Sequence, residues 1–438
     1  MTVIAFIIGV ALLVVGLAVS IALHEIGHLV PAKKFGVRVG QYMIGFGPTL
    51  WSRRIGETEY GVKALPLGGY ISMAGMYPPS DATASGAAGK AGGGFFATMV
   101  QDARTANDET LAAGSGSRGL YFYELPVWKR IIIMLGGPVM NFLLAVVLFT
   151  IVVSGIGAQT ATTTIAAVSE CVLPAGTSQT TCTSSDPASP AAAAGILPGD
   201  VIVSVDGTDV DTFAEASAII QDKPETTIPI VVERDGQRQS LQVTPMLATR
   251  QVAGEDGTAT TAEVGFVGMT ATVEYERQPI WEGPKAAVTQ TQQVAGIIWQ
   301  LPVRVYDTAV DLVTGQERDP NSPLSVVGAG RLAGDVAATD TPILNRVSGL
   351  LTILGALNIA LFVFNLIPLL PLDGGHILIA LWDGIRRFWA KLWHRPPPKP
   401  VDATRLVPVT FVVVIALAVM TVVLVAADLF NPVQLLGG

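Results

Sequence analysis

The chain has 438 residues, 50% of them hydrophobic and 14% charged, with a formal net charge of −8. It is too apolar for a soluble enzyme of this length and too polar to lie wholly inside a membrane. Its 27 basic residues gather beside apolar runs rather than in one patch, so we expect no nucleic-acid partner.

Four uncharged runs are long enough to cross the roughly 30 Å hydrocarbon core of a bilayer as helices. They cover residues 2–23, 131–153, 347–372 and 406–427. The first run lacks a basic leader and is too long for the apolar core of a secretory signal. We therefore expect a polytopic α-helical membrane protein with four transmembrane helices.

An HExxH motif, from His24 to His28, stands at the end of the first run. Residues four apart share one face of a helix, so both imidazoles can converge on one Zn²⁺ while Glu25 takes a proton from water. Ionisable side chains in a membrane span are costly and indicate a functional site. The other interpretation is the polar end of a surface helix.

The third run ends in a second polar motif, NLIPLLPLDGGH, at residues 365–376. Two prolines interrupt the helix, and the freed backbone groups are tolerated only where they are buried in protein or line a wet cavity. A catalytic zinc needs a third protein ligand and keeps its fourth position open for water. Asp373 and His376, three residues apart on one helix face, are both candidates.

Two further segments precede and enter the second run. Residues 37–73 alternate apolar and polar positions between turn signals, which predicts a small antiparallel sheet against the membrane. Residues 78–117 are mostly Gly, Ala, Ser and Thr, which indicates a flexible insert. Gly136-Gly137-Pro138 inside the second run permits either close helix approach or a simple kink.

The distribution of charge predicts the orientation of the chain in the membrane. Residues 30–130 carry 11 basic residues and 382–405 carry six, whereas 154–346 contain ten basic and 23 acidic residues. By the positive-inside rule, the two basic loops are cytoplasmic, and the acidic segment and both termini are extracytoplasmic. Cys171 and Cys182 fall in the acidic segment, where an oxidising compartment favours a disulfide over two free thiols.

Short strands and turns follow one another in the acidic segment. They are a turn at 198–200, a strand ending at Asp206-Gly207, an amphipathic helix at 213–220, and a hairpin of 228–234 with 238–244. This pattern resembles the PDZ family over residues 162–271. The resemblance implies a peptide ligand that adds as a strand to an open sheet edge, and the alternative is a β-rich spacer without a ligand.

Together these motifs resemble the RseP-like group of site-two proteases, which are intramembrane zinc metalloproteases. The resemblance covers nearly the whole chain and includes Gly-Pro-x-x-Asn-Phe at residues 137–142. It implies that His24, His28 and Asp373 bind Zn²⁺, that Glu25 is the catalytic base, and that His376 supports the site without binding zinc.

The resemblance also implies how a substrate is held. Asn365 would bind the substrate backbone, and Gly68, Gly69, Tyr70 and Ile71 would pair with an unwound substrate strand. Unwinding is needed because the carbonyl groups of a membrane helix are tied up in hydrogen bonds and shielded. The implied substrate is a single-span membrane protein, such as an anti-sigma factor already trimmed outside the membrane.

Two other classes of protein are alternatives to a protease. A membrane receptor with a purely structural HExxH would keep its function when Glu25 alone is changed. A metal transporter would place polar residues along its spans and show repeated halves, neither of which the sequence has.

The expected organisation is a cell-membrane enzyme of nine segments in contact with the lipid bilayer. They are transmembrane helix 1 at 1–30, a membrane-associated β-loop at 31–77, a cytoplasmic insert at 78–118, transmembrane helix 2 at 126–156, an extracytoplasmic α+β PDZ domain at 160–275, an extracytoplasmic membrane-proximal segment at 276–342, transmembrane helix 3 at 343–385, a cytoplasmic loop at 386–404 and transmembrane helix 4 at 405–430.

Overall fold

The chain forms two compact units, Met1–Ile156 with Pro279–Gly438 (unit 1) and Gly157–Gln278 (unit 2). The computed structural model describes residues 2–76, 120–172, 182, 186–253, 259–316, 318–319, 322–396, 398–401 and 406–433. The insert expected at 78–118 lies outside the described residues.

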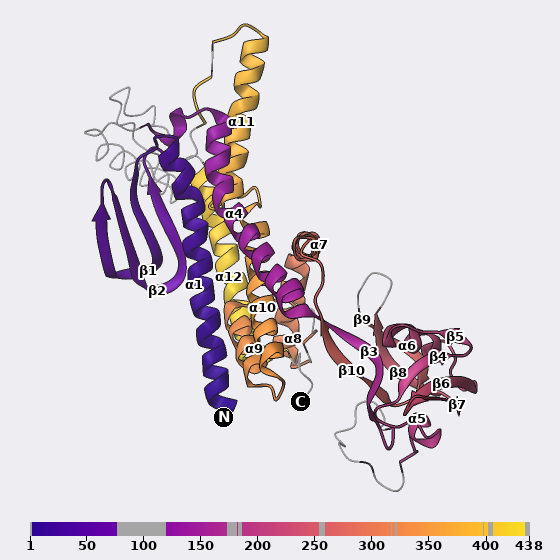
Figure 1. Ribbon diagram of the computed structural model, residues 1–438. Coiled ribbons are helices and arrows are strands. Elements are labelled where there is room, and N and C mark those ends of the chain that lie inside the picture. The colour runs from indigo at the N-terminus through magenta and orange to yellow at the C-terminus, as the bar shows by residue number, and fades with distance from the viewer. Residues whose placement is uncertain are drawn as a thin grey trace. The chain divides into compact units, whose positions relative to one another are not determined.

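Four helices among the described residues are long and apolar enough to cross a membrane, which confirms the expected number. They belong to unit 1 and are α1 (Thr2–Lys34), α4 (Val127–Thr150, continued by the π-helical η2, Ile151–Gly157), α10 (Ile343–Asn365) and α12 (Val407–Phe430). In Figure 1, α1 and α4 run past each other through the middle of the unit. Many of their Val, Ile and Leu side chains are exposed, as expected of surfaces that face lipid.

Glycines bring these helices into backbone contact. A Cβ atom added at Gly27 would overlap the carbonyl oxygen of Gly136, and one added at Gly136 would overlap that of Gly27. The crossing of α1 and α4 therefore leaves no room for side chains, which favours the close-approach interpretation of the glycine pair. Gly9 meets Ala333 of α9 (Val326–Ala338) in the same way.

The expected sheet over residues 37–73 is confirmed as the hairpin β1 (Val39–Ile55) and β2 (Thr58–Met73). Both strands bend, so that each contributes two paired segments. Residues 39–44 pair with 69–73 on one side and with 59–62 on the other. Residues 59–62 pair in turn with 51–55. Within the described residues, the segment 69–73 has ladder partners on one side only, and we call it the sheet edge. It packs beside the C-terminal half of α1 (Figure 1).

The third transmembrane element, expected as one segment over 343–385, consists of two helices. After α10 the chain turns through a cis Leu370-Pro371 bond and enters α11 (Asp373–Leu392). Cβ atoms at Gly374 and Gly375 would overlap the backbone of residues 366–370, so these glycines allow the turn to fold back on the helix. Helix α11 also continues beyond residue 385, into the segment expected to be a loop.

Helices that the sequence did not predict fill the segment 276–342. They are α7 (Glu282–Ile298), α8 (Leu301–Thr314) and α9. Elsewhere in the chain, a short 3₁₀ turn, η1 (Phe122–Glu124), precedes α4. Helix α7 packs on α4 and α10 around the fully buried Ala287. Arg318 Nη1 and Asp428 Oδ1 form a buried ion pair of 2.6 Å, and Asp428 also accepts hydrogen bonds from the backbone of Ser325 and Gly328. These contacts tie the end of α12 to the start of α9.

Unit 2 contains a sheet in the order β10-β3-β4-β6-β7, with β5 beside β4, and a separate β8-β9 hairpin. The strands are β3 (Ala158–Val168), β4 (Val201–Val205), β5 (Thr208–Asp209), β6 (Ile228–Arg234), β7 (Gln237–Val243), β8 (Met246–Ala253), β9 (Ala259–Phe266) and β10 (Met269–Glu276), with helices α5 (Pro190–Ala193) and α6 (Phe213–Gln221). The predicted strand, helix and hairpin from 201 to 244 are thereby confirmed. Buried Ile and Val side chains of β4 and β6 lie at the centre of its core.

A buried carboxylate closes the turn that leads into β4. Asp200 accepts hydrogen bonds from Arg234 at 2.8 Å and from the backbone N–H of Leu197 at 2.9 Å. The Arg234 guanidinium holds the pKa of the Asp200 carboxyl below its usual range, so this carboxylate stays charged at neutral pH. The sulfurs of Cys171 and Cys182 are bonded, as the sequence favoured.

Candidate metal centre

Three side-chain donors from two helices converge within unit 1. His24 Nε2 and His28 Nε2 of α1 lie 3.2 Å apart, and each lies 3.3 Å from Asp373 Oδ2 at the start of α11. The HExxH spacing brings the imidazoles together, and the glycine-rich turn before α11 brings the carboxylate to them. We call these three residues the metal cluster. It is the only such group of His, Cys, Asp or Glu donors found in the described part of the chain.

The ring nitrogens that face away from the cluster have partners on α4. His28 Nδ1 donates a hydrogen bond of 2.7 Å to the carbonyl oxygen of Ile133, which leaves the Nε2 lone pair directed into the cluster. His24 Nδ1 lies 3.2 Å from the carboxamide of Asn141. The oxygen and nitrogen of the Asn141 carboxamide exchange places when the side chain flips, and the two orientations have the same shape. When His24 binds a metal through Nε2, its Nδ1 carries the proton and donates a hydrogen bond to the Asn141 oxygen. Both imidazoles are thus held in orientation by buried contacts.

The donor set fits zinc. At zinc–ligand distances of about 2.0–2.1 Å, the corners of a tetrahedron lie roughly 3.3–3.4 Å apart, which matches the separations within the metal cluster. Asp373 Oδ2 is buried and has no hydrogen-bond partner among the described residues, an arrangement that suits a cation ligand. A Cβ atom at Gly137 would overlap His28 Nε2 and lie 2.7 Å from His24 Nε2, so only glycine leaves the cluster its space.

A cavity of about 290 Å³ opens at the metal cluster. Of the residues that the sequence singled out, it brings together His24, Glu25, His28, Gly69, Tyr70, Ile71, Asn365, Asp373 and His376. Gly68 is not among its lining residues. Gly68 has a φ of +97° and lies against the ring of Phe46, so it shapes the strand rather than the cavity. Sequence reasoning missed the lining residues Met73, Met76 and Met134, while Pro371 belongs to the proline-interrupted motif at 365–376.

The sheet edge is fixed against α1 beside Glu25. A Cβ atom at Gly69 would lie 3.0 Å from Glu25 Cγ and 2.9 Å from Ile21 Cγ2, so a larger residue would push the strand away. Tyr42 Oη donates a hydrogen bond of 2.9 Å to the carbonyl oxygen of Ala22 in α1. Burial raises the pKa of Tyr42 to about 12, and its hydroxyl therefore remains a donor at physiological pH.

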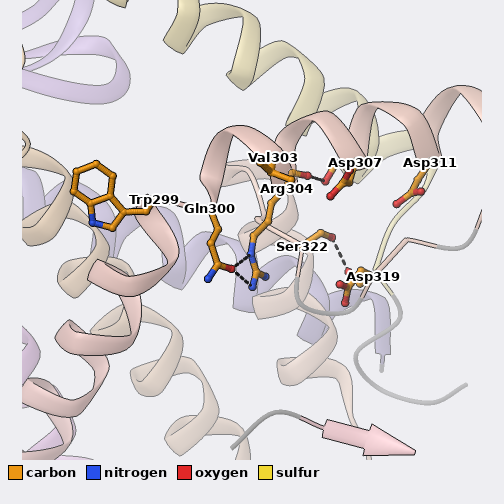
Figure 2. Close-up of a pocket in the computed structure, with 9 residues that line it drawn as sticks. Trp299, Gln300, Val303, Arg304, Asp307, Asp311, Asp319 and Ser322 are labelled. Carbon is orange, nitrogen blue, oxygen red and sulfur yellow. Dashed lines mark hydrogen bonds between the residues drawn. The ribbon is translucent and has the colours of Figure 1, made fainter. Parts of the chain in front are cut away.

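A larger cavity of about 420 Å³ lies between α8 and the residues Asp319 and Ser322, and its lining differs chemically from that of the metal cluster. Figure 2 shows Gln300, Arg304, Asp307 and Asp311 along one side of α8, with Asp319 and Ser322 on the facing turn. Gln300 Oε1 accepts two hydrogen bonds from Arg304. This cavity contains no histidine, and its carboxylates do not form a group like the metal cluster. Volume alone therefore does not identify the catalytic centre.

The comparison with known sequences agrees with this geometry. The sequence model of peptidase family M50 matches residues 12–393. The chain belongs to peptidase family M50. It is 34% identical to zinc metalloprotease Rip1 of Mycobacterium tuberculosis, over 98% of this chain and 99% of that protein. It is 33% identical to Rip1 of Mycolicibacterium smegmatis over 98% of both chains, and 28% identical to metalloprotease MmpA of Caulobacter vibrioides over 88% of both.

These findings confirm the resemblance to site-two proteases. The M50 enzyme is a zinc metalloprotease whose cofactor is Zn²⁺. Its four apolar helices make it a multi-pass membrane protein.

Proposed function

We propose that this M50 protease hydrolyses a peptide bond within the membrane-spanning segment of single-span membrane proteins. The observation that carries the proposal is that the metal cluster, Glu25 and the sheet edge meet in one cavity at the end of apolar helices. A soluble substrate would not require a centre at this position. A transporter would need polar groups at several depths, whereas here the ionisable side chains gather around one point.

Asp373 is the third zinc ligand in this proposal. Its Oδ2 atom lies at the same 3.3 Å distance from both imidazole nitrogens, which supports a shared metal. His376 lines the same cavity but does not belong to the group of converging donors. This geometry supports Asp373 rather than His376 as the third ligand.

Glu25 acts as the general base and then as the general acid. His24, His28 and Asp373 would hold the zinc, which would supply Lewis-acid chemistry that makes water more acidic and polarises a carbonyl group. Glu25 is 8% exposed and lies next to the ligands on α1, so it can accept the proton of the attacking water. It then donates that proton to the leaving amine as the peptide bond breaks. The buried position keeps bulk water away from this proton transfer.

The substrate is held as an extended strand. The sheet edge supplies unpaired backbone groups, and Gly69 places that edge directly beside Glu25. A strand added there would present a carbonyl carbon next to the base, with main-chain hydrogen bonds providing the affinity. Asn365, at the end of α10, lines the same cavity and holds the substrate backbone from the other side.

Unit 2 screens substrates in this proposal and is the extracytoplasmic PDZ domain that the sequence pattern indicated. Its β4–β7 arrangement supports the assignment, as does a cavity of about 230 Å³ between α6 and residues 264–269 that can receive a peptide. The Cys171–Cys182 disulfide and the acidic composition of the segment support an oxidising, extracytoplasmic location. Both chain ends share that side, and residues 30–130 and 382–405 face the cytoplasm. The substrate class is a trimmed single-span regulator such as an anti-sigma factor.

The decisive experiment separates catalysis from zinc binding. Glu25→Gln should retain stoichiometric zinc and abolish cleavage of a single-span substrate, because Gln cannot accept a proton but leaves the ligands intact. His24→Ala, His28→Ala and Asp373→Ala should lose both, whereas His376→Ala should retain zinc. Zinc retained in Asp373→Ala and lost in His376→Ala would instead assign the third ligand to His376.

The substrate can be found by comparing membrane proteomes of cells with the wild-type enzyme and with Glu25→Gln. A single-span protein that accumulates after loss of its outer domain is the expected result. Normal turnover of all single-span proteins in Glu25→Gln cells would contradict a proteolytic role and favour the receptor alternative.

A further inference from the structure

Helix α11 carries an apolar stripe, from Leu378 to the C-cap residue Trp393, that stays exposed within the described part of unit 1. Its members recur at helical spacing and are between 46% and 65% exposed. They are Leu378, Leu381, Trp382, Ile385, Phe388, Trp389, Leu392 and Trp393. The opposite side, which includes Ala380 and Asp383, is buried against α4. An exposed stripe of this size marks an interaction surface rather than a scatter of surface residues.

The flanks of this stripe are basic. Arg386, Arg387 and Lys391 lie on the helix, and Arg395 and Lys399 follow it. Asp383 is the only acidic residue in the second half of α11, and it is already engaged. It forms a buried ion pair of 3.0 Å with Arg130 and accepts a hydrogen bond from the backbone of Val401, while Arg386 is 3.9 Å away. The exposed charge of this region is therefore positive.

Aromatic and basic side chains meet in a groove of about 620 Å³ between α11 and the chain that follows it. Its lining includes Trp382, Trp389 and Trp393 together with Arg386 and Arg395. Indole rings are favoured at the headgroup level of membranes because they combine an apolar body with one N–H donor. Arginine beside them suits a phosphate group because its fork of N–H donors matches phosphate oxygens.

A neighbouring helix end indicates that the membrane interface runs through this level. Trp128, at the start of α4, is 55% exposed, and Lys129 lies over the rings of both Trp128 and Phe35. Lys33 and Lys34 end α1 at the same side. Figure 1 shows α11 continuing past the end of α4 at this side of unit 1. Aromatic and basic residues thus form a belt of the kind that flanks membrane spans.

We propose that the groove of α11 with Arg395, Pro396 and Pro398 binds the headgroup of an anionic phospholipid, with the three tryptophans at the bilayer interface and Arg386 and Arg395 facing the phosphate. The bilayer, rather than a soluble partner, is the occupant because the apolar stripe lies on a helix that packs against the apolar span α4. Clusters of four or more basic residues next to a membrane span attract anionic lipids. The inference depends on the multi-pass membrane location and not on the proposed catalytic roles.

The position of this site gives it a link to catalysis. Helix α11 begins at Asp373 in the metal cluster and ends at the groove, and the Arg130–Asp383 pair fixes its middle to α4. Lipid bound at one end would therefore hold the axial position of the helix that presents Asp373.

The test uses the full-length protein in phosphatidylcholine nanodiscs that contain brominated lipid, which quenches nearby tryptophan fluorescence. Brominated phosphatidylglycerol should quench more than brominated phosphatidylcholine at equal mole fraction. This excess should fall in Trp389→Phe/Trp393→Phe, which removes two of the three tryptophans of the groove and leaves Trp382. In Arg386→Gln/Arg395→Gln the midpoint for phosphatidylglycerol should shift by at least about tenfold. The matched control Arg238→Gln/Arg277→Gln removes two exposed charges from unit 2 and should retain the excess.

Equal quenching by the two brominated lipids in the wild type would overturn the proposal, and would be the result if the groove receives a soluble protein instead. An unchanged excess in Arg386→Gln/Arg395→Gln would also overturn it. Arg386→Lys/Arg395→Lys keeps the charge and should retain the excess, and zinc content reports the folding of each variant. Loss of the excess in the Lys variant to the same degree as in the Gln variant would show that positive charge does not bind the lipid.

Discussion

The metal cluster and the sheet edge lie side by side, but they are built from different parts of the chain. The cluster consists of side-chain atoms, and both of its imidazoles are oriented by buried hydrogen bonds from α4. The sheet edge offers backbone groups, whose position depends on Gly69 and on the pairing with residues 39–44. The metal cluster therefore depends on the identity of its side chains, whereas the sheet edge depends on the register of its strands. Substitutions should therefore act in an all-or-none manner on the cluster and gradually on the edge.

Gly137→Ala should have the largest effect of the predicted substitutions. The new Cβ atom would overlap His28 Nε2, so at least one imidazole must move. Displacing a catalytic group by about 1 Å costs on the order of 100-fold in rate, and loss of zinc would abolish cleavage. Zinc content and cleavage should fall together. Gly155→Ala is the matched control, because its Cβ would be 3.9 Å from the nearest side chain.

Asn141→Ala should weaken zinc binding without abolishing it. Removing the hydrogen-bond partner of a metal-binding histidine typically costs 10–100-fold in metal affinity, and here the partner of His24 Nδ1 is lost. Competition with a chelator would measure the change. Asn141→Asp keeps an acceptor oxygen and should bind zinc more tightly than Asn141→Ala.

A second buried asparagine provides the control for Asn141. Asn358 donates a hydrogen bond of 2.9 Å to Ser20 between α10 and α1 and does not contact the metal cluster. Asn358→Ala should lower stability but leave zinc affinity unchanged. Equal loss of zinc affinity in Asn141→Ala and Asn358→Ala would show that Asn141 acts through packing rather than through His24.

The role of Asn141 also marks a limit of what the sequence could predict. Local patterns identified His24, Glu25 and His28, because a spacing of four residues on a helix has a direct spatial meaning. The contact between Asn141 and His24 joins residues 117 positions apart and has no local pattern. Gly136-Gly137-Pro138 allowed two interpretations from the sequence, close helix approach or a kink, and neither predicted that Asn141 contacts His24.

The helices of the segment 276–342 were the other gap in the prediction. The segment 276–342 contains three helices whose apolar positions are too few for a span, so hydropathy gave no signal. The buried Arg318–Asp428 pair that fastens this segment to α12 was not predicted either. By contrast, the four spans and the 37–73 sheet were predicted because long apolar runs and alternation with turns are local properties.

The smallest effect is expected at the sheet edge. If the Ile71 N–H faces the substrate, Ile71→Pro removes one donor from the strand that lines the cavity. A single hydrogen bond contributes roughly 0.5–1.5 kcal/mol, or about two- to tenfold in rate. Ile71→Val retains the donor and is the control. The loss should be greater for a substrate with a stable Leu-rich span than for one interrupted by Gly or Pro, because unwinding must precede attack and freed carbonyl groups are costly in lipid.

Cleavage of two matched substrates, identical outside the helix-breaking residues, measures this difference under conditions where chemistry limits the rate. If Ile71→Pro and Ile71→Val cleave both substrates at the same rate, the substrate is not held as an added strand. The metal cluster would keep its assignment, since its residues donate through side chains that the strand does not supply. The edge would then act only as a wall beside Glu25, and Gly69→Ala should still slow cleavage by pushing that wall away from the base.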